Sequence, residues 1–270
     1  MQNRIAARFD ELVSRDERAL VCYVVAGYPD LKTSEEAIDA LVVGGADIIE
    51  IGIPFSDPIA DGPTIQAASY SALEKGVTPE KALRLAKSVR KRHPELPLLA
   101  MTYCNILVRV GVEKFMAHAK ECGIDGFILP DMPVEEAGEY SQAASKLGLS
   151  LVFLASPNTS EARLRNIVKS TSGFLYLVSV YGITGARKSF EGYTLDAIRN
   201  VKRLAESKIP VAVGFGIKTP AHIRLMAGAG ADGVIIGSAI VDIMSKSSSK
   251  KKMLKELVDF AKSMKRACKK

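Results

Sequence analysis

Hydrophobic and polar residues follow two different periods along the chain. Short runs of mostly apolar residues, rich in β-branched side chains, predict buried strands. Longer segments with apolar residues at helical spacing predict amphipathic helices. The predicted strands are 20–25, 47–51, 98–103, 126–129, 149–154, 174–178, 210–213 and 233–236. The predicted helices are 33–43, 79–92, 112–121, 134–147, 160–171, 195–206 and 219–228, with further helices at 2–14 and 250–265. Strands that are apolar on both faces and separated by helices predict a parallel sheet covered on all sides.

A Gly-x-Asp unit recurs at 45–47, 123–125 and 230–232, each time between a predicted helix and a strand. Its glycine can end the helix in a left-handed conformation, and its aspartate opens the strand. A unit that recurs along the whole length favours one closed array over two unlike domains. We therefore predict an α/β fold, a single (β/α)8 TIM barrel over residues 1–270, with an extra N-terminal helix within 1–15. An open doubly wound sheet is the alternative, but no Gly-x-Gly-x-x-Gly follows the first strand.

The charge of the chain is concentrated at one end. Apolar residues make up 47% and charged residues 25%, which is ordinary for a globular protein, and the net charge is +7. Residues 246–270 hold ten Lys or Arg and two Asp or Glu, so the rest of the chain carries a net charge of −1. This distribution argues against a nucleic-acid surface over the body of the protein.

Residues 250–270 are expected to form a basic C-terminal helix. The segment contains an apolar stripe at helical spacing, made of Met253, Leu254, Leu257, Val258, Phe260 and Ala261. Such a stripe predicts a last barrel helix with a solvated, lysine-rich face, so we expect no nucleic-acid partner. Nucleic-acid binding through this segment remains the alternative.

Cysteine and histidine are sparse and scattered. The four cysteines form no Cys-x-x-Cys pair and the three histidines are dispersed, so neither a disulfide framework nor a metal site is indicated. No apolar stretch approaches 18 residues, and the N-terminus lacks the apolar run of a signal peptide. We expect a cytoplasmic protein with no membrane partner.

Two carboxylates follow the second predicted strand, and a barrel carries its chemistry at such strand ends. Glu50 lies among isoleucines, where burial would raise its pKa toward neutrality unless it pairs with an Arg or Lys. Asp61 lies in a proline-rich loop that would hold its side chain rigidly, and a helix cap is its alternative role. Asp57 precedes a proline and is expected to form a turn. Two carboxylates at one strand end are typical of acid–base sites with divided roles.

Two glycine clusters follow the last two strands, at 214–220 and at 237–242, where a short helix begins. Barrels commonly bind phosphate at this place, because glycines let an anion approach the backbone and the helix end presents unpaired N–H groups. Ordinary turns with a serine N-cap are the alternative.

The segment after the sixth strand, residues 180–192, is rich in glycine and polar residues. This composition predicts a mobile loop that closes over a ligand, with an ordinary surface loop as the alternative.

No lysine lies within a strand or in its last residue, so a Schiff base lacks its nucleophile. Nucleophile-elbow and Walker motifs are also missing. Carboxylate acid–base catalysis on a phosphorylated small molecule is what remains.

Residues 50–66, EIGIPFSDPIADGPTIQ, resemble the signature of the tryptophan synthase alpha chain family. Further similar motifs are DMPVEE at 131–136, GITG at 182–185, GFGI at 214–217 and GSAIV at 237–241. The resemblance spans essentially the full length. It implies a (β/α)8 barrel with an extra N-terminal helix and a carbon–carbon lyase of tryptophan biosynthesis. This lyase would split indole-3-glycerol phosphate into indole and glyceraldehyde 3-phosphate by a retro-aldol step that needs no cofactor.

The resemblance also implies roles for individual residues. Glu50 and Asp61 would be the catalytic pair. The closing loop would use Tyr176, Thr184 and Gly185, and the phosphate would be held by Gly185, Gly216, Gly237 and Ser238. Phe215 would contact the substrate, as would Tyr23, which stands where a Phe can wall the indole pocket. Tyr181 is bulkier than the residue expected inside the closing loop.

The resemblance further implies an assembly of two alpha and two beta chains. Indole would pass to the beta chain, which carries the pyridoxal phosphate. Asn105 and residues 131–135 are candidate contacts, with exposed loop polarity as the alternative. Two other functions stay open: another phosphate-binding barrel, an isomerase or epimerase, and a non-catalytic metabolite-binding protein.

Overall fold

The computed structural model describes residues 3–178, 187–206, 208–214 and 216–269. These residues contain nine parallel strands in one sheet, with the order β5-β4-β3-β2-β1-β9-β8-β7-β6. The strands are β1 (Ala19–Val25), β2 (Ile48–Gly52), β3 (Leu98–Met101), β4 (Gly126–Ile128), β5 (Ser150–Val152), β6 (Leu154–Ala155), β7 (Leu175–Val178), β8 (Val211–Gly214) and β9 (Gly233–Ile236).

The sheet closes into a barrel through residues 150–155. β5 and β6 are separated by Phe153 alone, and β5 pairs with β4 whereas β6 pairs with β7. The carbonyl of Phe153 accepts the N–H of Tyr176, so hydrogen bonding continues across the break. The predicted TIM barrel is confirmed, and the predicted strand 149–154 is divided where it changes neighbours.

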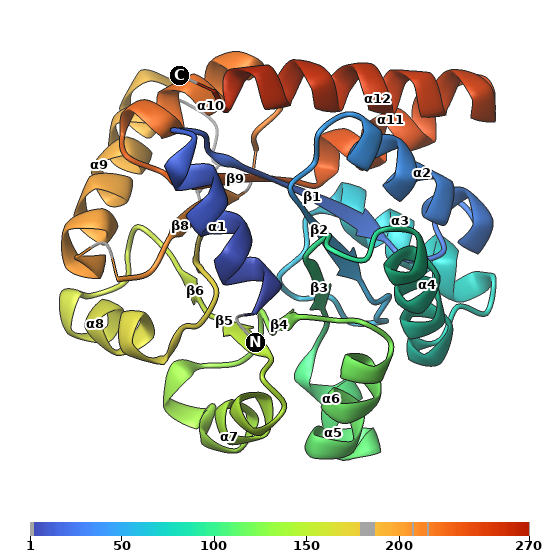
Figure 1. Cartoon of the computed structure of the whole chain (residues 1–270), viewed down its shortest axis with the longest axis horizontal. Coiled ribbons are helices and arrows are strands. Elements are labelled where there is room, and N and C mark those ends of the chain that lie inside the picture. Colours follow the sequence, from blue (N-terminus) through green and yellow to red (C-terminus); the bar gives the residue numbers. More distant parts are fainter. Residues whose placement is uncertain (1–2, 179–186, 207, 215, 270) are drawn as a thin grey trace.

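Helices surround the strands (Figure 1). They are α1 (Arg4–Ser14), α2 (Leu31–Val43), α3 (Pro63–Glu74), α4 (Pro79–Arg92), α5 (Cys104–Val110), α6 (Val112–Glu121), α7 (Gly138–Lys146), α8 (Glu161–Ser170), α9 (Arg187–Ala205), α10 (Pro220–Gly228), α11 (Ser238–Lys246) and α12 (Lys250–Ala267), with a 3₁₀ turn η1 (Val134–Glu136).

Four helical segments differ from the prediction, and one of them, α3, was not among the predicted helices. The predicted helix 134–147 begins as the separate turn η1, and no helix was predicted at α5, which follows the predicted strand 98–103 directly. The carboxylate of Asp131 starts α5 by accepting the N–H of Cys104 at 3.0 Å. Helix α9 begins at Arg187, so residues 187–192 of the expected loop are helical, and residues 179–186 lie outside the described part.

Helix α1 closes one end of the barrel (Figure 1). Its buried residues Ile5, Phe9 and Leu12 pack with the interior side chains of the strands, among them Ile48 of β2 and Leu99 of β3. The rings of Phe9 and Phe174 lie 5.6 Å apart. Because α1 covers the N-terminal ends of the strands, the carboxyl ends are left for a site.

The repeated aspartates fasten the same N-terminal end. Each carboxylate accepts the backbone N–H that opens a neighbouring strand: Asp47 with Leu20, Asp125 with Leu98 and Asp232 with Val211, at 2.7, 2.9 and 2.7 Å. Each also pairs with a cation from a helix, respectively Lys265, Arg90 and Lys202, at 2.8, 2.6 and 2.6 Å. The repeat is therefore a structural device in which every carboxylate has a backbone and a cationic partner.

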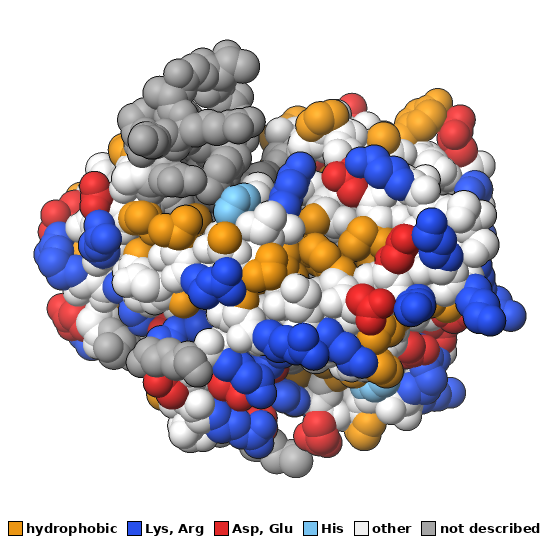
Figure 2. Space-filling view, turned by 90° about the horizontal axis from the view of Figure 1, so that it is seen from above, with side chains coloured by type: hydrophobic (Ala, Val, Ile, Leu, Met, Phe, Trp, Pro, Cys, Tyr) orange, Lys and Arg blue, Asp and Glu red, His pale blue; other side chains and the backbone are white. Residues whose placement is uncertain are grey.

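Helix α12 covers the barrel with its apolar face. Met253, Leu257 and Ala261 are buried, and the predicted stripe packs against the main core. A Cβ on Gly44 would lie 2.4 Å from that of Ala261, so a glycine lets α2 and α12 approach closely. Seen from this side, Lys and Arg side chains lie spread over the surface between patches of hydrophobic side chains (Figure 2).

Candidate active site

Glu50 projects into the barrel interior from β2. Side chains alternate along a strand, and Ile48, two positions earlier, belongs to the interior cluster that α1 closes. Glu50 is 1% exposed, and neither carboxyl oxygen has a hydrogen-bond partner among the described residues. Burial raises the pKa of Glu50 to about 8, with a further contribution from the charge of Asp61. The alternative of a structural ion pair is therefore not realised in the described part of the chain, and Glu50 is protonated at neutral pH.

Asp61 lies in the loop between β2 and α3 and is partly buried. The N-cap of α3 is Gly62, without a side-chain cap, so Asp61 is not the helix cap that the sequence allowed. Its carboxylate instead accepts a hydrogen bond from the Tyr103 hydroxyl at 3.0 Å. Burial raises the pKa of Asp61 to about 6, and the Tyr103 hydrogen bond opposes that rise. At neutral pH the pair thus consists of a neutral Glu50 and an ionised Asp61.

Two buried tyrosines lie beside this pair. Tyr23 is the β1 residue in register with Glu50, and Tyr176 projects into the interior from β7. Burial raises the pKa of both phenols well above the usual value, and both carboxylates raise it further. Both tyrosines therefore remain protonated.

Glycines make room for the two phenols. A Cβ on Gly52 would lie 2.1 Å from the Tyr23 hydroxyl, and one on Gly214 would lie 2.3 Å from the Tyr176 hydroxyl. Each glycine ends the strand next to that of its tyrosine. A larger residue at either position would push the phenol out of place.

Three of the four predicted phosphate residues, Gly216, Gly237 and Ser238, follow the adjacent strands β8 and β9. Gly216 has a φ of 75°, a conformation that favours glycine, and Gly237 is the N-cap of α11 without a side-chain cap. Ser238 is the first residue of α11, so the alternative of a serine N-cap is wrong. A Cβ on Gly237 would lie 3.2 Å from the Tyr23 ring, which places the start of α11 beside the interior site.

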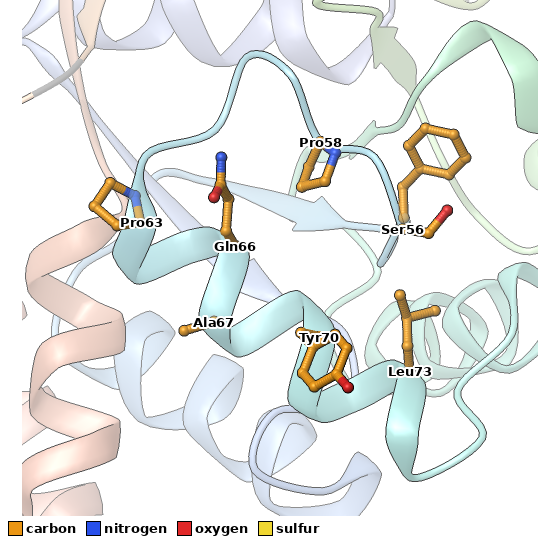
Figure 3. Close-up of a pocket in the computed structure, with 8 residues that line it drawn as sticks. Ser56, Pro58, Pro63, Gln66, Ala67, Tyr70 and Leu73 are labelled. Carbon is orange, nitrogen blue, oxygen red and sulfur yellow. The ribbon is translucent and has the colours of Figure 1, made fainter.

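A groove of about 400 Å³ lies outside the barrel, between α3 and the loop that carries Asp61 (Figure 3). Pro63, Gln66, Ala67, Tyr70 and Leu73 line it from α3, and Phe55, Ser56 and Pro58 line it from the loop. None of the carboxylates described above lines this groove, so it is not the acid–base site.

A family model of the tryptophan synthase alpha chain matches residues 9–269. The chain belongs to this family. The tryptophan synthase alpha chain of Methanosarcina mazei is 46% identical over 260 residues, which cover 96% of this chain and 93% of the relative. A structure of tryptophan synthase subunit alpha from Legionella pneumophila is 35% identical with a TM-score of 0.88 and covers 99% of both chains. A tryptophan synthase structure from M. tuberculosis is 32% identical with a TM-score of 0.87, covering 99% of this chain and 100% of that one.

Membership in the tryptophan synthase alpha chain family confirms the predicted lyase activity, the cleavage of indole-3-glycerol phosphate in tryptophan biosynthesis. The isomerase or epimerase and the non-catalytic alternatives are not favoured. Within the described residues, no helix is both long and apolar enough to cross a membrane. No group of three or more His, Cys, Asp or Glu in that part of the chain could hold a metal ion.

The residues predicted for this tryptophan synthase alpha site fall into three sets. Glu50, Asp61, Tyr23 and Tyr176 come together at the carboxyl ends of β1, β2 and β7. Gly216, Gly237 and Ser238 follow β8 and β9. Thr184, Gly185 and Phe215, together with Tyr181, lie outside the described residues.

Tyr103 is a site residue that the sequence analysis missed. The predicted strand 98–103 ended on it, and a signal was present, since alternation gives Tyr103 the same face as Leu99, an interior residue. Asp131, a candidate partner contact, also has a role within the chain at the start of α5.

Proposed function

We propose that Glu50 and Asp61 are the acid–base pair with which this chain splits indole-3-glycerol phosphate. The observation that carries the proposal is Glu50 itself, a fully buried carboxyl with no partner in the described chain and a pKa of about 8. A group in this state can release and recover a proton near neutral pH, which a carboxylate in an ion pair cannot do.

The reaction needs an electron sink, because the C–C bond that breaks joins indole C3 to the glycerol carbon bearing a hydroxyl. Glu50 gives its proton to C3, which leaves a positive charge on the indole ring. Asp61, ionised, accepts the indole N–H and stabilises this charge. Glu50, now a carboxylate, takes the proton of the glycerol hydroxyl. The aldehyde C=O forms as the C3 bond breaks, and the bonding electrons return to the ring. Indole and glyceraldehyde 3-phosphate result, and Glu50 is protonated again.

The substrate phosphate is proposed to bind at Gly216, Gly237 and Ser238, with Gly185. The position of α11 supports this, since its uncapped N-terminus presents backbone N–H groups beside Tyr23. Tyr23 and Tyr176 would wall the indole pocket together with Phe215, and Thr184 would belong to a closing loop ahead of α9. The chain would need no cofactor of its own, because its carboxyls supply the acid and base.

A tryptophan synthase beta chain is the proposed partner, in an assembly of two alpha and two beta chains in the cytoplasm. The beta chain would carry the pyridoxal phosphate and consume the indole. Asn105 is exposed at the start of α5, and Asp131 ties residues 131–135 to the same helix end. Both contacts would therefore lie on one surface near the site.

The test is Glu50→Gln, assayed for indole release with and without a beta chain. Glutamine keeps the size of the side chain but carries no transferable proton, so we expect the rate to fall by about 10³-fold, within the range for an acid–base group. Binding of glyceraldehyde 3-phosphate should stay within about twofold. Glu95→Gln, at an exposed glutamate before β3, serves as the control and should retain full activity. Full activity in Glu50→Gln would overturn the assignment.

A further inference from the structure

Tyr103 is fixed to the loop that carries Asp61 by three contacts. The residue is 3% exposed and lies between β3 and α5. Its hydroxyl accepts the N–H of Ala60 at 3.2 Å and donates to Asp61 Oδ2 at 3.0 Å. Its ring stacks on Phe55, with ring centres 5.1 Å apart and planes at 25°. All three contacts reach the segment 53–62, so one side chain joins the end of β3 to the loop after β2.

The two hydrogen bonds of the phenol fix the direction of its proton. Because a lone pair of the oxygen accepts the N–H of Ala60, the single O–H proton is directed to Asp61. Burial and the adjacent carboxylate raise the pKa of Tyr103 above its ordinary range, so the phenol keeps this proton throughout the working pH. The donor to Asp61 is therefore permanent.

No other donor to this carboxylate is found among the described residues. The backbone of Asp61 has its own contacts: its N–H bonds to the Pro58 carbonyl, and its carbonyl accepts from Gln66. These bonds hold the chain but leave the carboxylate free to rotate and to take up a proton. Among the described residues, only the Tyr103 hydroxyl donates a hydrogen bond to the carboxylate itself.

We propose that Tyr103 is a positioning residue that keeps Asp61 ionised and oriented for the indole N–H. This inference rests on the proposed role of Asp61. A donor hydrogen bond stabilises the ionised carboxylate against the burial that favours the neutral acid. Phe55 stacks on the phenol ring and also lines the external groove, so this residue joins the groove to the support of the catalytic loop.

The test is Tyr103→Phe, which keeps the ring and its stack on Phe55 but removes the hydroxyl. A hydrogen bond to a charged group changes an ionisation equilibrium by about tenfold, so Asp61 should titrate at higher pH in the variant. We expect the rate of indole release, relative to the unchanged chain, to fall about fivefold more at pH 6 than at pH 8. Equal losses at the two pH values would contradict the proposal.

Two controls keep the outcome unambiguous. Tyr140→Phe removes another buried phenol, on α7, which has no contact with Asp61, and its pH profile should not change. Carbon-13 NMR of the Asp61 carboxyl gives a readout that needs no turnover. A higher titration midpoint of Asp61 in Tyr103→Phe supports the inference whether or not the chain releases indole. Failure of the unchanged chain to release indole would refute the proposed function, and not the inference about Tyr103. An unchanged midpoint overturns the inference even in an active enzyme. A 3-fluorotyrosine at position 103, a stronger donor, should lower the midpoint.

Discussion

The strand β2 and the residue before it hold two buried carboxylates in opposite surroundings. Asp47, at the N-terminal end of the barrel, accepts the N–H of Leu20 and pairs with Lys265 at 2.8 Å. Glu50, toward the other end, has no partner in the described chain. Burial raises the pKa of both groups, but Lys265 opposes the rise at Asp47, whereas the charge of Asp61 adds to it at Glu50. The two ends of the barrel therefore have different roles. At the N-terminal end, carboxylates with hydrogen-bond and charge partners stabilise the fold. Toward the carboxyl end, a carboxyl without such partners in the described chain is available for proton transfer.

The largest effect on stability is expected from breaking an aspartate–cation pair at the N-terminal end of the barrel. Asp125→Ala removes the partner of Arg90, which lies 2.6 Å away, and of the Leu98 N–H, and leaves a partly buried guanidinium without its charge partner. We expect the free energy of unfolding in urea to fall by about 3–5 kcal/mol, the usual cost of breaking a buried pair.

Activity per folded molecule of Asp125→Ala should be nearly unchanged, because this pair lies at the end of the barrel away from Glu50. Asp196→Ala is the matched control, since its pair with Arg199 is exposed, and it should cost less than about 1 kcal/mol. A loss of similar size in both variants would refute the proposed division between the two ends.

The second prediction concerns the stability that the fold loses by burying the Glu50 carboxyl without a partner in the described chain. The pKa of Glu50 is about 8 in the folded chain and near 4.5 when unfolded, so the folded state binds the proton more tightly. The unfolding free energy of the unchanged chain should therefore decline as pH rises from about 4.5 to about 8. Glu50→Gln removes this decline, and because each pKa unit corresponds to about 1.4 kcal/mol, we expect it to be more stable by several kcal/mol at pH 8.5, with no gain at pH 4. Thermal unfolding at the two pH values measures the difference, and an equal effect at both would contradict a neutral, buried Glu50.

The third prediction is the pH dependence of kcat for indole release. The reaction needs Asp61 ionised and Glu50 protonated, so kcat should fall below about pH 6 and above about pH 8. One pH unit beyond each limit the rate should be about tenfold below its maximum. Tyr103→Phe should move only the acid limb. A rate that continues to rise to pH 10 would exclude Glu50 as the proton donor.

Much of the fold could be predicted from the sequence because local patterns determine it. The Gly-x-Asp repeat located the ends of α2, α6 and α10 and the strands that follow them. The cations that satisfy these aspartates could not be predicted, because Lys265 lies 218 positions from Asp47 along the chain. The division of the fifth strand at Phe153 was also hidden, since a continuous apolar run does not show that the backbone changes its pairing partner.

The sequence also located the carboxylates of the site, but it did not predict the groups that surround them. Isoleucines on both sides of Glu50 predicted its burial, but only the closed barrel shows that it faces the interior and that no cation among the described residues pairs with it. The hydrogen bond between Tyr103 and Asp61 joins residues 42 positions apart, so no local pattern contains it. Local sequence thus located the carboxylates, whereas their protonation states depend on groups from other strands.

The central claim is that Glu50 is a neutral acid at the pH where the enzyme works. Carbon-13 NMR of chain labelled at the glutamate carboxyl measures this directly, with the Glu50 signal assigned by its absence from Glu50→Gln. We expect a protonated carboxyl at pH 7 that titrates near pH 8. A signal that is already fully ionised at pH 5 would contradict it.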